Sequence, residues 1–235
     1  MIFLNDTYGN AKKLADRCEE ILDFCKHLGS EFNYSSLVFC IIDAVFSIGT
    51  HYSGAEKAVK NYAEKYNLSR YNAEIPQAEH RISDFINNCD TAGNFERLAE
   101  NVFGNRQRTS STNGILKSEA CYDVAKVLKE HSIETLSDFR DMTEETEKQV
   151  VAKIKQVKGQ SSGIMIDYLF MLAGDENKFK PDRHLLSFIS DTLEDNNGIT
   201  ELIESAHRIL KEKHPDLTVR HLDYLIWNYQ RKANK

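Results

Sequence analysis

The stretch best suited to chemistry is a glycine-containing turn between two helical segments. The turn reads Lys158-Gly-Gln-Ser-Ser-Gly163. Gly159 can adopt a positive φ, and Gly163, which has no β-carbon, allows another backbone to approach closely. Amide groups at such a turn and at the start of the next helix then point outward, where an anionic phosphate would be stabilised. The pattern predicts a phosphate-binding hairpin over about 143–173, and an ordinary helical hairpin with two glycines stays the alternative.

A single carboxylate stands out beyond this turn. Asp182 lies in the segment Lys180-Pro-Asp-Arg-His184, directly after Pro181. This position suits a residue that caps the N-terminus of a helix. A carboxylate held there could also stabilise positive charge that develops on a substrate, or activate a water molecule. The two roles are compatible, and the sequence leaves both open.

The order of hairpin, buried helix, short loop and Lys-Pro-Asp-Arg-His resembles the helix-hairpin-helix (HhH-GPD) superfamily of base-excision DNA glycosylases. Gly159 matches the first hairpin glycine of that family, and Asp182 matches its catalytic aspartate. His184 falls on the histidine two places later. Weaker likenesses extend the resemblance to most of the chain: the segment 43–47 is similar to the family's central helix, and 217–227 to a closing helix.

The resemblance implies a DNA glycosylase that acts in base-excision repair. Such an enzyme would hydrolyse the N-glycosidic bond of a damaged or modified base that has left the stack, with Asp182 as the catalytic carboxylate. Duplex DNA would be the partner. The implied DNA-binding residues are those of the turn, the two charges beside Asp182 and two arginines of a polar loop: Lys158, Gly159, Gln160, Ser161, Ser162, Gly163, Lys180, Arg183, Arg106 and Arg108. The implied base pocket is formed by His51, Tyr52 and Tyr168.

Each of these residues also has a plainer interpretation. Lys180 and Arg183 could be ordinary surface charges, and the loop with Arg106 and Arg108 could be solvated and flexible. His51 and Tyr52 could lie half-buried at a helix junction. Tyr168 could belong to the core.

Three departures from the family narrow the predicted chemistry. Bifunctional members carry a lysine nucleophile just after the hairpin, but no lysine occurs between Gly159 and Lys178. We therefore expect a monofunctional reaction that uses water. No cysteine follows Cys121, so an iron–sulfur cluster is not expected. No cofactor is required, although hairpins of this family often hold a monovalent or divalent cation through backbone carbonyls. The segment 46–49 lacks the family's glutamine, so the excised base stays unidentified.

The elements that must position these residues are predicted to be helical throughout. Three prolines and eleven glycines punctuate 235 residues, which favours long helices over many short strands. Apolar periodicity and caps predict an all-α chain, and no segment is a convincing strand. The resemblance implies two helical lobes with a DNA cleft between them. One lobe would span 31–165, and the other 1–30 plus 166–235. The predicted helices cover about 10–28, 35–48, 54–66, 75–90, 93–103, 116–128, 133–139, 143–157, 162–173, 182–193, 199–213 and 218–231.

Charge and composition set the remaining expectations. The net charge of −6 argues mildly against a nucleic-acid partner, but segment 148–184 holds seven basic and four acidic groups, a local charge of +3. Five cysteines without a C-x-x-C pair indicate a reducing compartment. No apolar run is long enough for a membrane span, and no signal peptide is recognised. We expect a cytoplasmic monomer, associated with the nucleoid if the source is prokaryotic.

Two other functions stay open at this point. The chain could be a non-catalytic helix-hairpin-helix module that binds DNA, in which case binding would weaken with salt and no base would be released. It could also be a helical protein-interaction domain, in which case DNA would not bind even at low salt.

Overall fold

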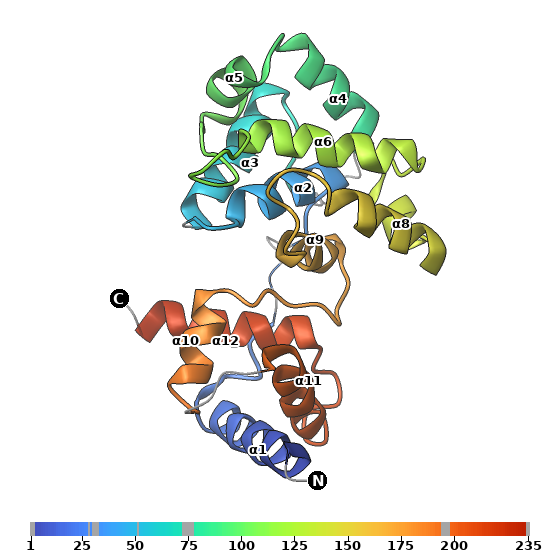
Figure 1. Ribbon diagram of the computed structural model, residues 1–235. Coiled ribbons are helices and arrows are strands. Elements are labelled where there is room, and N and C mark those ends of the chain that lie inside the picture. The colour runs from blue at the N-terminus through green and yellow to red at the C-terminus, as the bar shows by residue number, and fades with distance from the viewer. Residues whose placement is uncertain are drawn as a thin grey trace. The chain divides into compact units, whose positions relative to one another are not determined.

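The computed structural model describes residues 3–27, 29, 33–50, 52–71, 78–193 and 198–233. Every regular element in these ranges is helical, and the only β-type pairing among them is two isolated bridges (Figure 1). The all-α prediction is therefore confirmed. The chain divides into two compact units, which we call unit 1 (Met1–Leu28 and Asp175–Lys235) and unit 2 (Gly29–Gly174).

Unit 2 contains the predicted hairpin. Its elements are α2 (Leu37–Ser47), α3 (Tyr52–Lys65), α4 (Ile82–Thr91), α5 (Phe95–Leu98), the π-helical turn η2 (Ala99–Phe103), α6 (Lys117–Glu130), α7 (Leu136–Arg140), α8 (Glu144–Ile154) and α9 (Ile164–Ala173). We expected the boundary between the lobes at residue 165, but α9 belongs to unit 2 up to Gly174. The reason is packing: α9 lies against α2, and its side chains join the unit 2 core.

Helix α2 forms the centre of unit 2. All eleven of its residues are buried, including the carboxylate of Asp43. Buried charges require partners. The Asp43 carboxylate accepts hydrogen bonds from Tyr34 Oη at 2.9 Å and Ser47 Oγ at 2.7 Å. Tyr168 Oη, from α9, lies 3.5 Å from the same carboxylate. A polar network thus fixes α9 against the central helix.

The ends of α2 are satisfied by distant side chains. We expected a serine cap, but Ser36 makes no side-chain cap bond. Instead, a Glu79 Oε1 atom accepts from the Leu37 amide at 3.1 Å. At the other end, the buried Lys117 ammonium donates to the carbonyls of Phe46 and Ile48, at 3.0 and 2.7 Å. The terminal amides and carbonyls of a helix have no partner within the helix, and these two side chains supply hydrogen bonds to them.

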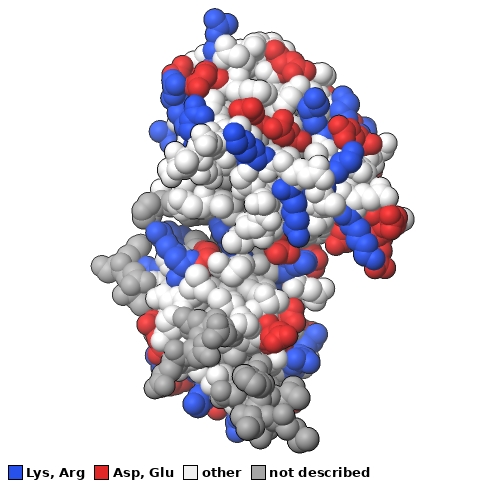
Figure 2. All heavy atoms as spheres, in the orientation of Figure 1, with Lys and Arg blue, Asp and Glu red and all other residues white. Residues whose placement is uncertain are grey.

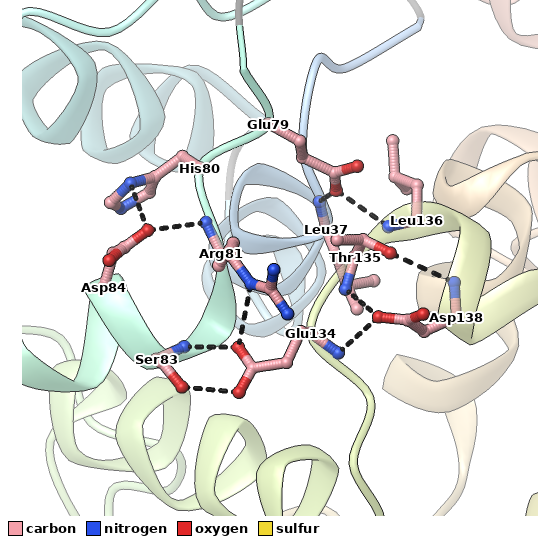
Figure 3. Close-up of polar contacts among 10 residues, drawn as sticks. All are labelled: Leu37, Glu79, His80, Arg81, Ser83, Asp84, Glu134, Thr135, Leu136 and Asp138. Carbon is pink, nitrogen blue, oxygen red and sulfur yellow. Dashed lines mark hydrogen bonds and ion pairs between the residues drawn. The ribbon is translucent and has the colours of Figure 1, made fainter.

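Carboxylates cap two further helices at the same place (Figure 3). The Glu79 atom that caps α2 also accepts from the Leu136 amide of α7, at 2.7 Å. Glu134 accepts from the Ser83 amide of α4 at 2.8 Å, and Asp138 accepts from the Glu134 and Thr135 amides at 2.9 Å each. The positive ends of α2, α4 and α7 are therefore neutralised within the protein.

Unit 1 contains Asp182. Its helices are α1 (Phe3–Ile21), α10 (Arg183–Ser190), α11 (Ile199–Leu210) and α12 (Val219–Ala233). Helix α1 packs on α11, and α12 contacts both α10 and α11. Their apolar faces form a core separate from that of unit 2. Three histidine side chains bind protein acceptors here: His207 the Leu217 carbonyl, His214 the Glu19 carboxylate and His221 the Lys26 carbonyl.

Several predicted helix bounds were wrong. Helix α1 ends at Ile21, not residue 28, because Asp23 forms a turn in which its Oδ1 accepts from the Cys25 amide at 3.2 Å. Helix α4 begins at Ile82, where Asp84 reaches back to the Arg81 amide in a capping box. The segment 93–103 forms a short α5 followed by a π-helical turn. Among the described helices, none combines the length and the apolar character that a bilayer crossing needs.

Candidate functional site

The predicted hairpin consists of α8, a turn over 155–163 and α9. Thr143 caps α8 by accepting from the Thr146 amide, as predicted. Both turn glycines have a positive φ, +89° at Gly159 and +81° at Gly163. Ser161 and Ser162 are exposed residues, and within the described part of the chain their amides make no hydrogen bond. These amides stand just before the N-terminus of α9, the arrangement that stabilises an anion.

The close approach that we expected at Gly163 occurs instead at Gly159, which lies against the loop at 104–114. A β-carbon at this position would lie 2.4 Å from Thr109 Cβ and 2.6 Å from Thr109 Oγ1. No real side chain tolerates such contacts. The structure therefore brings the hairpin turn against the loop that carries Arg106 and Arg108, two of the predicted DNA-binding segments.

The charges at the turn come from two lysines. Lys158 is exposed, as predicted, and Lys155 passes over Gly163, with Cε 3.4 Å from where a β-carbon would stand. Neither makes an ion pair within the described residues, whereas Lys148 and Lys153 of α8 pair with Glu144 and Glu130. On the face of unit 2 drawn in Figure 2, basic and acidic side chains are interspersed. The positive charge is thus local to the turn.

Gln160 does not have the predicted role. Its side chain is 3% exposed, so it cannot contact a DNA strand at the surface. Its Oε1 atom and Thr109 Oγ1 are buried without a hydrogen-bond partner among the described residues. Both are side-chain oxygens, a ligand type that hard cations use, whereas the cation that the resemblance implies would be held by backbone carbonyls.

The two loop arginines are engaged within the protein. Arg106 pairs with Glu96 and Glu100. Arg108 Nη1 donates to the Gly114 carbonyl at 2.9 Å, and its Nη2 lies 3.7 Å from Glu96. These contacts hold the loop in shape and reduce its positive charge. The loop is solvated at both arginines, and phosphate contacts there would compete with the existing partners.

Of the three residues of the predicted base pocket, the structure describes the side chain of Tyr168 alone. Tyr168 is 6% exposed and lies in the unit 2 core, beside Asp43. The plainer interpretation of Tyr168 is thus confirmed. His51 lies outside the described residues. Tyr52 is the first residue of α3, and its side chain also lies outside the description.

Asp182 caps α10, as predicted. Its Oδ1 atom accepts from the His184 amide at 2.8 Å and from the Leu185 amide at 3.2 Å. Two amide donors and the start of a helix hold the carboxylate in one orientation and stabilise its charge. Arg183, the next residue, is exposed on the first turn of α10.

A second carboxyl group, Asp223 of α12, accompanies Asp182. Burial raises the pKa of Asp223 to about 8, and the charge of Asp182 contributes to that rise. The Lys180 charge and the Lys180 amide, which donates to Asp223, oppose it. With a pKa of about 8, the Asp223 carboxyl is mostly protonated at neutral pH. A carboxyl that holds its proton near neutral pH is a group suited to acid–base chemistry.

The sequence analysis missed Asp223 and Lys155. In the local sequence, nothing distinguishes these two residues from ordinary surface charges. A partial signal exists for Asp223, because it interrupts the apolar pattern of the closing helix. Its proximity to Asp182 depends on the loop 175–182, which α12 holds through the Arg220 amide and the Glu176 carbonyl at 3.0 Å.

Metal chemistry by a side-chain cluster finds no support in the described part of the chain, where no three His, Cys, Asp or Glu residues are grouped to hold an ion. The hairpin lies in unit 2, while Asp182 and Asp223 lie in unit 1. Unit 2 thus carries a candidate anion-binding turn, and unit 1 separately carries two acidic residues of interest.

Substitution of the turn glycines tests the close approach. We expect Gly159→Ala to destabilise unit 2 by about 2–4 kcal/mol, because it adds a clash to the cost of a positive φ. Gly163→Ala should cost only about 1–2 kcal/mol, because only the flexible end of Lys155 lies near. Urea denaturation followed by circular dichroism measures both. In the Gly159→Ala background, Thr109→Gly should restore part of the lost free energy of unfolding. Equal losses in Gly159→Ala and Gly163→Ala would contradict the close contact between Gly159 and Thr109.

The pH dependence of stability tests Asp223. Its pKa is about 8 in the folded protein and about 4 in the unfolded chain, so ionisation favours the unfolded chain as pH rises from about 4 to about 8. Asp223→Asn keeps an acceptor for the Lys180 amide and cannot ionise. We expect it to match the wild type at pH near 4 and to become progressively more stable than the wild type up to pH near 9, by roughly 1.4 kcal/mol for each unit by which folding raises the pKa.

The measurement is denaturation monitored by the fluorescence of Trp227, the only tryptophan, which lies on the same helix. Asp216→Asn, at an exposed aspartate of unit 1, is the control and should follow the wild-type curve. Parallel curves for Asp223→Asn and the wild type would contradict the protonated carboxyl.

Comparison with known proteins gives one family. No curated protein and no solved structure matches the chain. A family model described as a domain of unknown function (DUF8548) matches residues 12–231, nearly the whole sequence. The chain therefore belongs to the DUF8548 family.

Proposed function

We propose that this protein is a monofunctional DNA glycosylase that hydrolyses the N-glycosidic bond of a damaged or modified base in base-excision repair. The observation that carries the proposal is the carboxyl pair at the start of α10. A helix cap alone needs one acceptor, and Asp182 supplies it. The protonated Asp223 beside it has no part in the cap. The choice of a DNA base as the substrate comes from the resemblance of the hairpin and of Asp182 to the glycosylase superfamily.

The chemistry follows from charge. Cleavage of the N-glycosidic bond leaves positive charge on the sugar, and the Asp182 carboxylate would stabilise this charge and orient the attacking water. The water loses a proton as it adds to the sugar carbon, and Asp182 is the base within reach. Asp223, which already holds a proton, would keep the pair at a single negative charge. No lysine of α9 is available to form a covalent intermediate.

Binding would rest on the hairpin. The exposed amides of Ser161 and Ser162 would receive a phosphate of the DNA backbone, and Lys155 and Lys158 would add charge. A cation held by the buried oxygens near Gly159 would supply further positive charge there. These contacts would be made with the DNA backbone and not with the bases, so they would not depend on base sequence. Because they are electrostatic, affinity should fall steeply with salt. The acidic remainder of the chain would limit binding elsewhere.

A second candidate, the non-catalytic DNA-binding module, is favoured by one observation. The two amide bonds of Asp182 suffice to explain its presence as a cap. The module and the enzyme would bind DNA alike, and they differ only in whether a base is released.

Replacement of Asp182 separates the two candidates. The wild type is incubated with oligonucleotides that each carry one damaged or modified base, and abasic sites are counted. We expect release from one substrate class, and Asp182→Asn should slow it by about 100-fold or more because the charge is lost. Asparagine is an equally good N-cap, so folding and DNA affinity should be retained.

The matched control is Asp191→Asn, which removes a carboxyl group from the other end of α10. It should release the base at the wild-type rate. Unchanged activity in Asp182→Asn would remove that residue from the mechanism. Salt-sensitive DNA binding without release from any substrate would favour the non-catalytic module.

A further inference from the structure

A row of stacked aromatic and cationic side chains runs along α12. Tyr224 and Trp227 have ring centroids 6.3 Å apart with planes at 29°. The Arg231 guanidinium lies over Trp227 at 4.5 Å from its centroid. His221 extends the row in the other direction, at 6.4 Å and 27° from Tyr224. We call His221, Tyr224, Trp227 and Arg231 the α12 row.

The helical period explains why these residues meet. Tyr224, Trp227 and Arg231 are three and four positions apart, which places them on one face of the helix. The opposite face carries Leu222, Leu225 and Ile226, which are buried in the unit 1 core. By the same spacing, Trp227 and Arg231 lie on the side of α12 away from these residues, whereas Tyr224 also packs against the unit 1 core. Tyr224 and Trp227 are partly exposed, and Arg231 is exposed.

The α12 row contributes little to the unit 1 core beyond Tyr224, because the other face of the helix supplies the main apolar contacts. Its charges also have a pattern: cations lie over aromatic rings, with Arg231 above Trp227 and the Lys26 ammonium 5.7 Å from the Tyr224 centroid. Aromatic and guanidinium planes beside positive charges are what proteins use to stack unpaired nucleobases while holding the phosphate backbone. Peptide partners do not require such planes in series.

The same helix carries the carboxyl pair. Asp223 directly precedes Tyr224, and α10, which Asp182 caps, packs against α12. An unpaired base stacked on the row would thus lie on the helix whose carboxyl pair would act in base release.

We propose that the α12 row is a binding site for unstacked nucleobases of single-stranded or locally opened DNA. The exposed Arg231 guanidinium offers the accessible plane of the row, while Lys26 and Arg231 attract the phosphates. The inference rests on the proposed function for the choice of DNA, but base stacking needs no bond cleavage. Its test therefore does not depend on catalysis.

Trp227 is the only tryptophan of the chain, so its fluorescence reports directly on this site. The full-length protein is titrated with a short oligothymidylate and with an abasic oligonucleotide of the same length and charge. We expect saturable quenching of Trp227 by the oligothymidylate and little by the abasic strand, because only the former has bases to stack. Absence of quenching, or equal quenching and affinity with both strands, would overturn the proposal.

Variants identify the contacts. Arg231→Gln and Tyr224→Leu should each weaken oligothymidylate binding about fivefold or more, as measured by the anisotropy of a labelled strand. Tyr224→Phe keeps a ring and should bind like the wild type. The charge-matched control is Arg208→Gln, at an exposed arginine of α11, which should leave binding unchanged. If Arg231→Gln and Arg208→Gln lost the same affinity for oligothymidylate, overall charge would explain both losses, and a stacking site would be contradicted.

One variant separates this inference from the proposed function. Asp182→Asn should lose base release and keep the quenching of Trp227 by oligothymidylate. If the wild type releases no base from any substrate yet shows base-dependent quenching, the glycosylase proposal fails and the stacking site stands. If base release occurs without base-dependent quenching, the stacking site is wrong.

Discussion

The burial of α2 is the constraint on which unit 2 depends. A helix that is surrounded by protein cannot leave its terminal amides and carbonyls to water, so other elements must supply partners. Glu79 does so at the N-terminus, and the buried Lys117 at the C-terminus. Each partner joins α2 to another element: Glu79 reaches α7, and Lys117 belongs to α6. The same requirement applies to Asp43, whose contact with Tyr168 connects α2 to the second helix of the hairpin.

The position of the hairpin turn follows from this arrangement. Helix α9 is held on α2, and the turn before it is held against Thr109 at a distance that only a glycine permits. With both sides fixed, the amides of Ser161 and Ser162 face outward in one arrangement and do not need to be ordered when an anion binds. Asp182 is prepared in a similar way, because α10 supplies two amides and α12 holds the preceding loop.

The sequence predicted the parts of this structure that depend on local chemistry. The helices, the Thr143 and Asp182 caps, and the positive φ at Gly159 follow from residue types and their spacing. It failed where a distant residue takes over a local role. Ser36 is a good cap by type, yet Glu79 caps α2 from 42 positions away. Gln160 looked exposed because its neighbours are polar, and it is buried because the loop at Thr109 covers the turn. The pairing of Asp223 with Asp182 likewise depends on tertiary contacts that no spacing in the chain reveals.

The central claim is that the hairpin turn binds DNA through its exposed amides. The most direct measurement is a titration of isotope-labelled protein with a short undamaged duplex, followed by amide chemical shifts. We predict that the largest shifts at low salt occur at Ser161, Ser162 and their neighbours in the turn, and that they reverse as salt is added. DNA binding with unchanged amide shifts in this turn, or no binding at low salt, would contradict the claim.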